Sequence, residues 1–571
     1  MKPKVANLFL MTLLLSSFLF PVGVSAATDS TIVIIERVDY LSVNRNWDDI
    51  SLLYEDQFHD AGEVDEEIER IHSLVPELVD LEVVGQSYEG LNISVVRITN
   101  EQNPVQKAKT LVVAHHHGRE QITIEMALRF ILKLLNLYGV DDTITSYVDT
   151  QEIYIIPTIN PDTLDPIVNG GNHWLRKNLH PFNDDGDDET DEDSCEDVNG
   201  DGAIYGRDVY TKTGPGGSLE YQYTYYEGID NDGDGQINED PIGYVDLNRN
   251  YPTGWGTDDA SSPDPLSQVF RGTSSFSEPE TQVFRDFALQ HRFTMAYSLH
   301  SGINATYFPA YDSNNWVEPG IYYQIVQDFN SFMTEGFNDI PGYPGVADSA
   351  PHSIERYAYS GYWEDWMYAT RGTTAPITFE LYHNATVDEP EMFTVIEDNS
   401  THYIEEWNGI YGYFAPVASA IEDTWHDMMP GFDYLLENTP YLTAANPTVS
   451  GGLNEGESVT VGVSLTCQSI LFDTTDPIYS LIDYGGPTLT EITISTPIID
   501  AGETRSQSTS FDLPINLATS SVSLYVGNNF TGYIHLRLSA GTAPPFDLLP
   551  IVAIGSVAFV ALVIVFVWKR T

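Results

Sequence analysis

The sequence predicts an α/β fold, with a mixed central sheet flanked by helices, joined to a C-terminal all-β, sandwich-like domain and one transmembrane helix. Strand-like and helix-like segments alternate over residues 37–425, which is typical of a sheet covered by helices. Over residues 440–540, short runs rich in Val, Ile, Thr and Ser are separated by Gly and Asn turns. Residues 548–568 are predominantly apolar and long enough to cross a bilayer as a helix. A chain of 571 residues is also too long for a single core.

The N-terminal residues 1–26 have the pattern of a secretory signal peptide. Lys2 and Lys4 precede an apolar run, and small residues at 24–26 provide a cleavage site before Ala27. The main body of the chain is therefore expected outside the cytoplasm.

The opposite end of the chain predicts a membrane anchor. Lys569 and Arg570 directly follow the apolar residues 548–568 and favour an orientation with a short cytoplasmic tail. A glycolipid-anchor signal is the competing interpretation of this segment. We expect a single-pass protein of the cell surface, with its main body on the outer side of the membrane.

The net charge of -59 is strongly acidic, with 84 Asp and Glu residues against 25 Lys and Arg residues. This balance argues against a nucleic-acid partner, because such proteins carry a basic surface. It suggests a solvated acidic surface, cation binding or a salty environment. The two cysteines, Cys195 and Cys467, are too few for a disulfide framework, and their spacing does not decide whether they pair.

The α/β region places reactive residues at the ends of predicted strands. Residues 110–114 form a buried-strand run that leads into three histidines and then into an amphipathic helix. Further strands are predicted over residues 153–157, 294–299 and 376–379. Functional groups in such sheets gather at the carboxyl ends of strands, and His117, His300 and Glu380 fall there.

A catalytic zinc site is predicted by two short segments far apart in the chain. His117, Glu120 and His300 supply two imidazoles and one carboxylate, a ligand set that leaves one zinc position open for water. Of the three consecutive histidines, only His117 has a glutamate three residues later. His115 and His116 are therefore expected to be structural residues at the end of the strand.

Residues 181–244 form an acidic, glycine-rich insertion with two calcium-loop patterns. The first comprises Asp197, Asn199, Asp201 and, at the twelfth position, Asp208. The second comprises Asp230, Asp232 and Asp234, but Pro241 holds its twelfth position, so Asn238, Glu239 or Asp240 would have to complete it. Calcium sites are the favoured interpretation, and a disordered acidic loop is the alternative.

Taken in chain order, the motifs of residues 39–423 resemble the zinc carboxypeptidase family of the A/B type. The matching segments are His117-Gly118-Arg119-Glu120, Asn160-Pro161-Asp162, Trp174-Leu175-Arg176-Lys177-Asn178, Asp246-Leu247-Asn248-Arg249-Asn250-Tyr251, Ser298-Leu299-His300-Ser301, Ser360-Gly361 with Asp365-Trp366, and Thr378-Phe379-Glu380-Leu381. The long insertion is the main departure from the family pattern.

The resemblance implies a role for each matching residue. Glu380 resembles the general base that takes a proton from zinc-bound water, and Arg176 the cation that stabilises the oxyanion. Asn248 and Arg249 resemble the pair that binds the substrate's terminal carboxylate. Two further residues resemble substrate contacts, the mobile tyrosine and an arginine further from the scissile bond: Tyr357 and Arg119.

The resemblance also places Glu364 in the pocket for the departing side chain. A buried carboxylate needs a cationic partner, so a C-terminal Lys or Arg is the first expectation for the substrate. The neighbouring Tyr362 and Trp363 could instead shape a pocket for aromatic residues.

These features predict a zinc-dependent metallocarboxypeptidase that hydrolyses the C-terminal peptide bond of peptides and proteins outside the cell. Within the same family, a hydrolase of cell-wall peptides or side-chain amides is the alternative. A catalytically dead, calcium-stabilised surface binding protein is the alternative from a different class.

Overall fold

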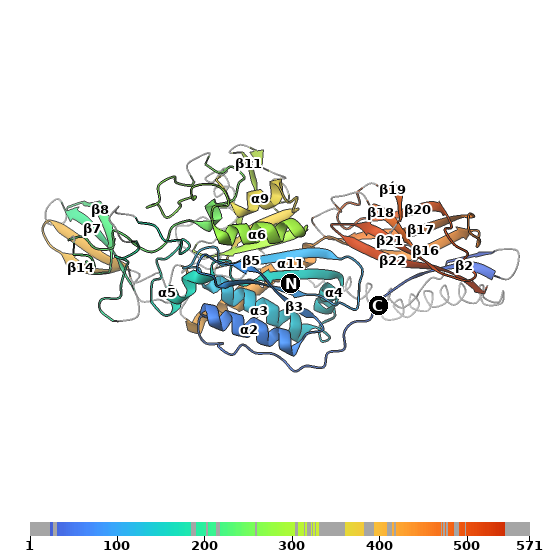
Figure 1. The fold of residues 1–571 in the computed structure, drawn as a ribbon, viewed down its shortest axis with the longest axis horizontal. Helices are drawn as coiled ribbons and strands as arrows, with labels where there is room; N and C mark the ends of the chain where they lie inside the picture. Colours follow the sequence, from blue (N-terminus) through green and yellow to red (C-terminus); the bar gives the residue numbers. More distant parts are fainter. Residues whose placement is uncertain are drawn as a thin grey trace, which may run out of the picture.

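The structure is a computed structural model with three parts along its long axis (Figure 1). It describes residues 23–26 and 31–542, apart from 184–189, 201–203, 213–216, 234, 257–259, 303–305, 313–314, 317–320, 322–323, 326, 330–359, 382–392, 408–413, 416–417, 470, 472–473, 475–477, 485–489 and 497. A small four-stranded lobe lies at one end, the α/β domain in the middle and a β-sandwich at the other end.

The central domain is built on a seven-stranded mixed sheet, as the sequence predicts. β13, β9, β5 and β6 are parallel, whereas β10, β4 and β3 are antiparallel to their neighbours. In sheet order the strands are β10 (Thr306–Tyr307), β13 (Ala375–Glu380), β9 (Met295–His300), β5 (Ala108–Ala114), β6 (Gln151–Ile156), β4 (Asn92–Ile98) and β3 (Val79–Gln86).

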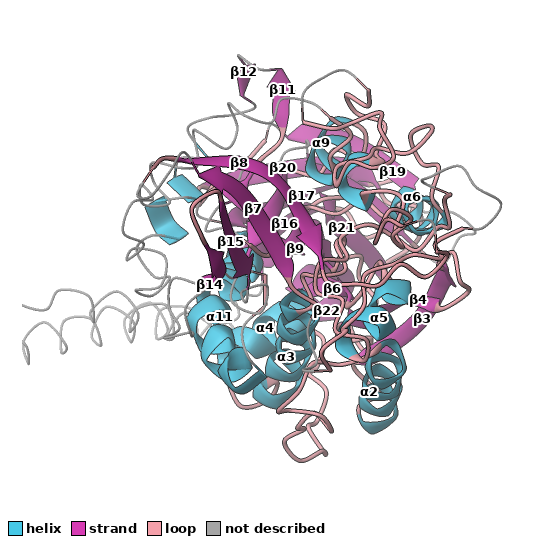
Figure 2. Cartoon of the chain, turned by 90° about the vertical axis from the view of Figure 1, so that its left-hand side faces the viewer, coloured by secondary structure: helices cyan, strands magenta, loops and turns pink. Residues whose placement is uncertain are grey.

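Helices cover both faces of this sheet (Figure 2), because its central strands are apolar on both sides. Val112 and Ala114 of β5 face a core shared with α2 (Ala61–Leu74), α3 (Ile122–Leu137), α4 (Asp142–Thr150) and α11 (Ile421–Asn438). Leu111 and Val113 face the opposite core, shared with α6 (Pro279–Gln290) and α9 (Trp363–Ala369). Short connecting elements are η1 (Pro161–Thr163), α5 (Leu164–Val168), η2 (Leu247–Arg249), β11 (Ala310–Asp312), β12 (Asn315–Trp316) and η4 (Ala418–Ala420).

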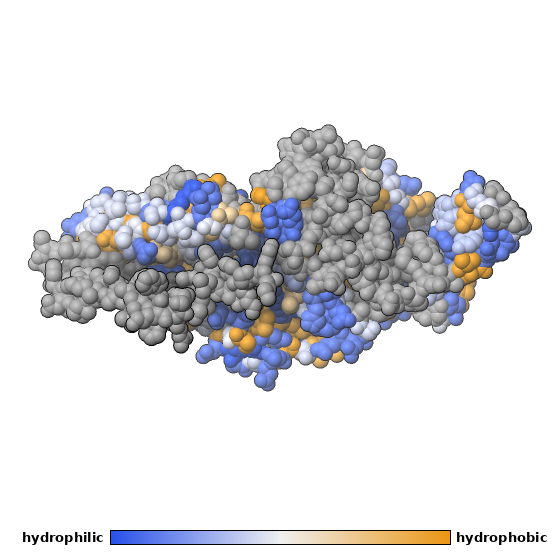
Figure 3. All heavy atoms as spheres, turned by 180° about the vertical axis from the view of Figure 1, so that it is seen from behind, coloured by the Kyte–Doolittle hydropathy of each residue, from blue (hydrophilic) through white to orange (hydrophobic). Residues whose placement is uncertain are grey.

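The acidic insertion forms a separate sheet together with a segment far away in the sequence. Strands β7 (Gly206–Lys212) and β8 (Leu219–Tyr226) come from the insertion, whereas β14 (Phe393–Asp398) and β15 (His402–Trp407) follow the catalytic strands. β15 pairs with β7 in the antiparallel order β14-β15-β7-β8. Hydrophobic residues lie between hydrophilic ones on the surface of this lobe, at the right-hand end of Figure 3. The sequence patterns did not predict this sheet.

The C-terminal strands pack as two sheets around one apolar core. One sheet has the order β1 (Gly23–Ala26), β2 (Thr31–Arg37), β22 (Gly532–Thr542), β21 (Val522–Asn528), β18 (Ile478–Asp483) and β19 (Thr490–Thr496). The other has the order β16 (Tyr441–Gly451), β17 (Ser458–Gln468) and β20 (Thr504–Asp512). An all-β sandwich was expected here, but the pairing of the N-terminal β2 with β22 was not, because it joins residues from opposite ends of the chain.

The hairpin between β21 and β22 docks on the central domain. The guanidinium of Arg292 lies 3.5 Å from the ring centroid of Phe530, and Thr294 Oγ1 donates a 2.7 Å hydrogen bond to the Phe530 carbonyl. The backbone N–H of Tyr533 donates to the carbonyl of Gln106 over 2.9 Å. These contacts tie the sandwich to the edge of the sheet opposite the carboxyl ends of its strands.

Both predicted membrane-directed segments extend beyond the described residues. The apolar segment 548–568 lies wholly outside them, and of the predicted signal peptide only β1 is described. Within the described ranges, no helix has the length and apolar character needed to cross a bilayer. Cys195 and Cys467 are both free thiols, so they are not bonded to each other.

Candidate active site

Three neighbouring parallel strands end at the same edge of the sheet and carry the predicted reactive residues. His300 and Glu380 are the last residues of β9 and β13 and stand opposite each other in the strand register. His117 follows β5, which pairs with β9 on its other side. Segments separated by more than 260 residues therefore meet at one point.

The turn after β5 directs His117 towards this point. His115 adopts a left-handed backbone conformation with φ of 65°, which turns the chain sharply at the end of the strand. Gly118 N–H donates to the Arg176 carbonyl over 3.1 Å, and a Cβ on Gly118 would lie 2.9 Å from the Leu175 carbonyl oxygen. Only glycine allows this close approach, which ties the His117 turn to the loop that carries Arg176.

The three predicted ligands converge. Glu120 Oε1 lies 2.7 Å from His117 Nδ1, Glu120 Oε2 lies 2.9 Å from His300 Nδ1, and the two Nδ1 atoms are 3.2 Å apart. Tetrahedral zinc with ligand distances of roughly 2.0–2.1 Å separates its ligands by about 3.3 Å, so a small outward shift fits the ion. The donor set is the nitrogen and oxygen chemistry that zinc prefers, and burial lowers the pKa of His300 to about 4, which keeps it neutral as a ligand must be.

Outer hydrogen bonds orient the two imidazoles. His117 Nε2 lies 3.1 Å from Asp246 Oδ1, so Nδ1 faces the ligand cluster. His300 Nε2 lies 3.0 Å from Ser298 Oγ, which also contacts His116 Nδ1 at 3.0 Å. His116 therefore lies outside the ligand group and contacts it through Ser298, in agreement with its expected structural role.

His115 also lies outside the ligand group. Its ring lies 2.9 Å from Thr158 Oγ1 and 2.7 Å from the Gly118 carbonyl oxygen. It thus stabilises the turn that carries His117.

Asp246 is the residue that the sequence interpretation missed. It is completely buried, and it accepts hydrogen bonds from Arg176 Nε at 3.0 Å and Nη2 at 2.8 Å, while Arg249 Nη1 lies 3.8 Å away. Burial opposes its ionisation, but the two guanidinium groups and His117 hold the pKa of Asp246 well below its ordinary value. A signal was present, because Asp246 lies three residues before Arg249 in the same motif, and buried arginines require a carboxylate partner.

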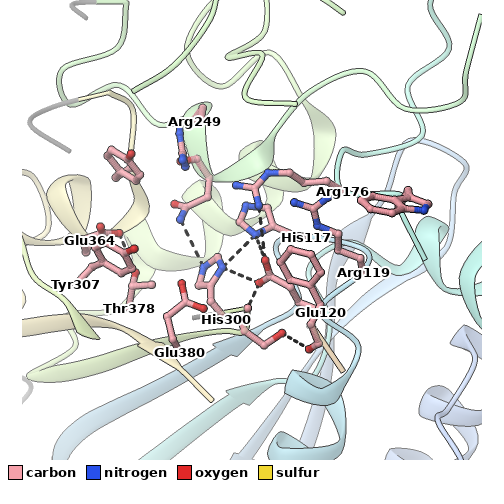
Figure 4. Close-up of a pocket in the computed structure, with 16 residues that line it drawn as sticks. His117, Arg119, Glu120, Arg176, Arg249, His300, Tyr307, Glu364, Thr378 and Glu380 are labelled. Atoms are coloured by element: carbon pink, nitrogen blue, oxygen red, sulfur yellow. Dashed lines mark hydrogen bonds and ion pairs between the residues drawn. The ribbon is translucent and has the colours of Figure 1, made fainter. Parts of the chain in front are cut away.

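A cavity of about 450 Å³ opens beside the ligand cluster. Figure 4 shows the predicted residues converging on it from different elements. Its lining includes six of the seven predicted catalytic and substrate residues: Glu380, Arg176, Asn248, Arg249, Arg119 and Glu364. The seventh, Tyr357, lies outside the described residues. Lining residues not predicted from the sequence include Trp174, Tyr307 and Phe414.

Two carboxylates face this cavity without a basic ion-pair partner among the described residues. Glu380 Oε2 is buried and has no hydrogen-bond partner in the described part of the chain, and burial together with Glu120 raises the pKa of Glu380 well above its ordinary value. Glu364 accepts a 3.0 Å hydrogen bond from Thr378 Oγ1, and burial raises the pKa of Glu364 as well. Each is stabilised in its ionised form when a cation enters the cavity.

The predicted calcium residues are only partly brought together. Asp201 and Asp234 lie outside the described residues. Asp208 was expected to close a loop but lies within β7, where it accepts a hydrogen bond from Thr224. Asp197 and Asp230 accept hydrogen bonds from the backbone of their own turns, at Gly200 and Gly233, while Asn199 N–H donates to Glu227.

Of the predicted calcium residues, only Asp232 joins a carboxylate group that could hold a metal within the described chain. Its partners are Asp193 and Glu239. Glu239 was one of three candidates to complete the second loop, whereas Asp193 was not foreseen.

The chain is similar to known zinc carboxypeptidases. The family profile described as Zinc carboxypeptidase matches residues 64–431. A protein named "Zinc carboxypeptidase" from Saccharothrix mutabilis subsp. capreolus is 34% identical over 128 residues, which cover 22% of this chain and 29% of that protein. Carboxypeptidase A1 of Rattus norvegicus is 22% identical over 389 residues, covering 67% of this chain and 71% of the relative. The crystal structure of the carboxypeptidase A from Helicoverpa armigera aligns with a TM-score of 0.43 at 22% identity, covering 67% of this chain and 73% of that one.

Zinc affinity should fall strongly when a ligand is removed and less strongly when only a residue that orients a ligand is changed. His300→Ala removes a ligand and should abolish zinc retention through dialysis, because two protein ligands hold the ion weakly. Asp246→Asn leaves all ligands in place but weakens the orientation of His117, and should reduce zinc affinity by about 10–100-fold. Zinc content measured by mass spectrometry of the metal checks both. Equal zinc content in the wild type and in His300→Ala would refute the ligand assignment.

Proposed function

This chain belongs to the zinc carboxypeptidase family, and on that premise we propose that it removes the C-terminal residue from peptides and proteins outside the cell, with Glu380 as the general base. One observation carries the proposal. The buried Glu380 carboxylate, the three converging ligands and the guanidinium groups of Arg176 and Arg249 all face a single cavity. That combination supplies a base, a metal and two anion-binding groups for hydrolysis of a bond next to a free carboxylate.

The ligand cluster and Glu380 carry the proton chemistry. His117, Glu120 and His300 would hold the zinc ion, which would lower the pKa of a bound water molecule and polarise the scissile carbonyl. Glu380 accepts the proton from the attacking water and then delivers it to the departing amine nitrogen. Burial raises the pKa of the Glu380 carboxyl well above its ordinary value, and the positive charge of a bound zinc ion would offset the cost of burying the ionised form.

The arginines take complementary roles in the same cavity. Arg176 is held by two hydrogen bonds to Asp246, and its Nη1 lies 3.6 Å from Glu120 Oε1, so its positive charge stands next to the reacting carbonyl. It stabilises the negative charge that develops on the carbonyl oxygen. Arg249 lies on the other side, 4.2 Å above the Tyr362 ring, and binds the terminal carboxylate with Asn248.

Glu364 supports a preference for a basic C-terminal residue. It is 5% exposed, it lines the cavity next to Thr378, and its side chain accepts a hydrogen bond from the neutral hydroxyl of that residue. A Lys or Arg side chain entering this end of the cavity would provide the missing positive charge. A neutral aromatic residue would leave the carboxylate buried without a cation.

The proposal also includes secretion of the protein and its anchoring at the outer surface of the membrane. The apolar residues 8–20 and 548–568 support secretion and anchoring of the body outside the cell. The acidic insertion supports calcium as a second metal.

Replacement of the base should separate chemistry from binding. Glu380→Gln should retain zinc and substrate affinity but lower kcat by at least about a hundredfold, the usual scale for loss of a general base. Stopped-flow hydrolysis of a blocked dipeptide together with zinc analysis checks this. A kcat within a fewfold of the wild type would show that another group activates the water.

Loss of Arg249 should remove the preference for a free C-terminus. The ratio of kcat/KM for a blocked dipeptide to that for its amide should fall by about 10–150-fold in Arg249→Ala, the range for losing a charged hydrogen bond of 1.5–3 kcal/mol. The matched control is Arg285→Ala, which removes a surface arginine paired with its neighbour Asp286. An unchanged ratio with zinc retained would refute the proposed binding of the terminal carboxylate.

Glu364 should decide which residue is released. In Glu364→Gln, kcat/KM for C-terminal Lys and Arg should fall by roughly thirtyfold or more, since truncating one partner of a buried charge pair costs about 2–5 kcal/mol. Release of C-terminal Phe should change much less. A peptide-library digest read by mass spectrometry measures both; a parallel loss for basic and aromatic residues would contradict the assignment.

A further inference from the structure

A second group of potential metal ligands lies in the insertion, away from the catalytic cavity. One carboxylate oxygen from each of Asp193, Asp232 and Glu239 lies within 4.8 Å of the others. The first comes from the segment before β7, and the other two come from the segment after β8. The backbones of these segments meet at an isolated β-bridge between Asp193 and Asp240. The carboxylates therefore come together through the fold and not through a single loop.

Asp193 gives this cluster a feature that exposed acidic groups lack. It is completely buried, and its Oδ2 has no hydrogen-bond partner among the described residues. Its Oδ1 accepts only a long contact of 3.5 Å from Asn231 Nδ2. Burying a carboxylate without compensation is costly, so a fully buried one directed into a carboxylate cluster indicates a bound cation.

We propose that Asp193, Asp232 and Glu239 bind one calcium ion that braces the insertion against the rim of the catalytic cavity. Calcium binds six to eight oxygens at roughly 2.3–2.6 Å, so two of its ligands are at most about 5.2 Å apart, and the three carboxylate oxygens, within 4.8 Å of one another, meet this limit. This site joins two segments of the insertion, whereas the spacing alone suggested two consecutive calcium loops.

A short chain of contacts leads from this site to the catalytic cavity. Asn238, next to Glu239, donates a 2.7 Å hydrogen bond from Nδ2 to the carbonyl of Tyr226. The Tyr226 ring packs against Trp174 with centroids 4.8 Å apart, and Trp174 lines the cavity together with Arg119. Calcium therefore holds Trp174 in place. This residue lines the cavity together with Arg119, which is expected to contact substrate residues before the scissile bond. This second step depends on the proposed peptidase function, whereas the metal site does not.

Calcium binding to the full-length, zinc-loaded protein tests the site directly. Isothermal titration of Ca²⁺ into the zinc-loaded protein in calcium-free buffer should show one tight site. Thermal unfolding with calcium present should show a rise in Tm of a few degrees, since only the folded insertion presents the ligands together. Asp193→Asn and Asp232→Asn should each weaken calcium affinity by more than about tenfold, because affinity follows the number of charged ligands. Zinc content should stay the same in both.

Two variants of the cluster and one control variant distinguish a loss of calcium binding from a loss of folding or of surface charge. Asp232 is exposed, so Asp232→Asn keeps the protein folded even if the buried Asp193→Asn does not. Glu220→Gln removes one exposed charge from the same lobe without touching the cluster and should bind calcium normally. Calcium affinity equal to the wild type in Asp232→Asn, equal loss in Glu220→Gln, or equally tight binding of Mg²⁺ would overturn the calcium site.

Substrate length tests the connection to the cavity. Removing calcium should raise KM for a peptide of six or more residues by severalfold, while KM for a blocked dipeptide and kcat for both change little. Asn238→Gly keeps the left-handed backbone at φ of 57° but removes the side chain, so calcium should still bind and KM for the long peptide should no longer respond to it. A calcium response that is the same for both substrates, or that persists in Asn238→Gly, would overturn the connection. Calcium binding without any peptidase activity would instead refute the proposed function and leave the metal site standing.

Discussion

One buried carboxylate organises the catalytic cavity. Asp246 contacts His117 Nε2, the side chain of Arg176 and the backbone N–H of Asn248, and it lies close to Arg249. A residue of the His-Glu-His ligand group and the residues proposed to stabilise the oxyanion and to bind the terminal carboxylate thus share one anchor. Because Asp246 is completely buried and ionised, the positive groups around it cannot move away without leaving its charge uncompensated. The relative positions of metal and substrate groups follow from this constraint.

The sheet supplies the second constraint. Parallel strands end at one edge, so β5, β9 and β13 deliver His117, His300 and Glu380 to the same place without any long loop. Both faces of these strands are buried under helices, which fixes the strand ends in position. His300 and Glu380 therefore lie at the ends of strands that are packed on both faces, and such packing favours the fixed orientation that catalysis by oriented charges requires.

The insertion sheet and the β-sandwich both contact the central domain, each at a different place. The insertion sheet reaches the cavity through Trp174, whose Nε1 donates a 3.0 Å hydrogen bond to the Ile204 carbonyl and whose ring packs on Tyr226. The β-sandwich attaches at the far side, through Phe530 and Arg292. The ligand group therefore lies within the central domain, and the insertion contacts one residue of the cavity lining, Trp174.

The sequence by itself determined the α/β class, the zinc ligands that come together and most of the cavity lining. Short motifs such as His117-Gly118-Arg119-Glu120 encode these locally, because strand periodicity and residue type depend on a few neighbouring positions. Only the tertiary structure decided the role of Asp246, the pairing of β2 with β22 and of β7 with β15, and the meeting of Asp193 with Glu239. Each joins residues distant in the chain, and local spacing carries no information about such pairs. Calcium-loop spacing placed Asp208 in a loop for the same reason, whereas long-range strand pairing places it in β7.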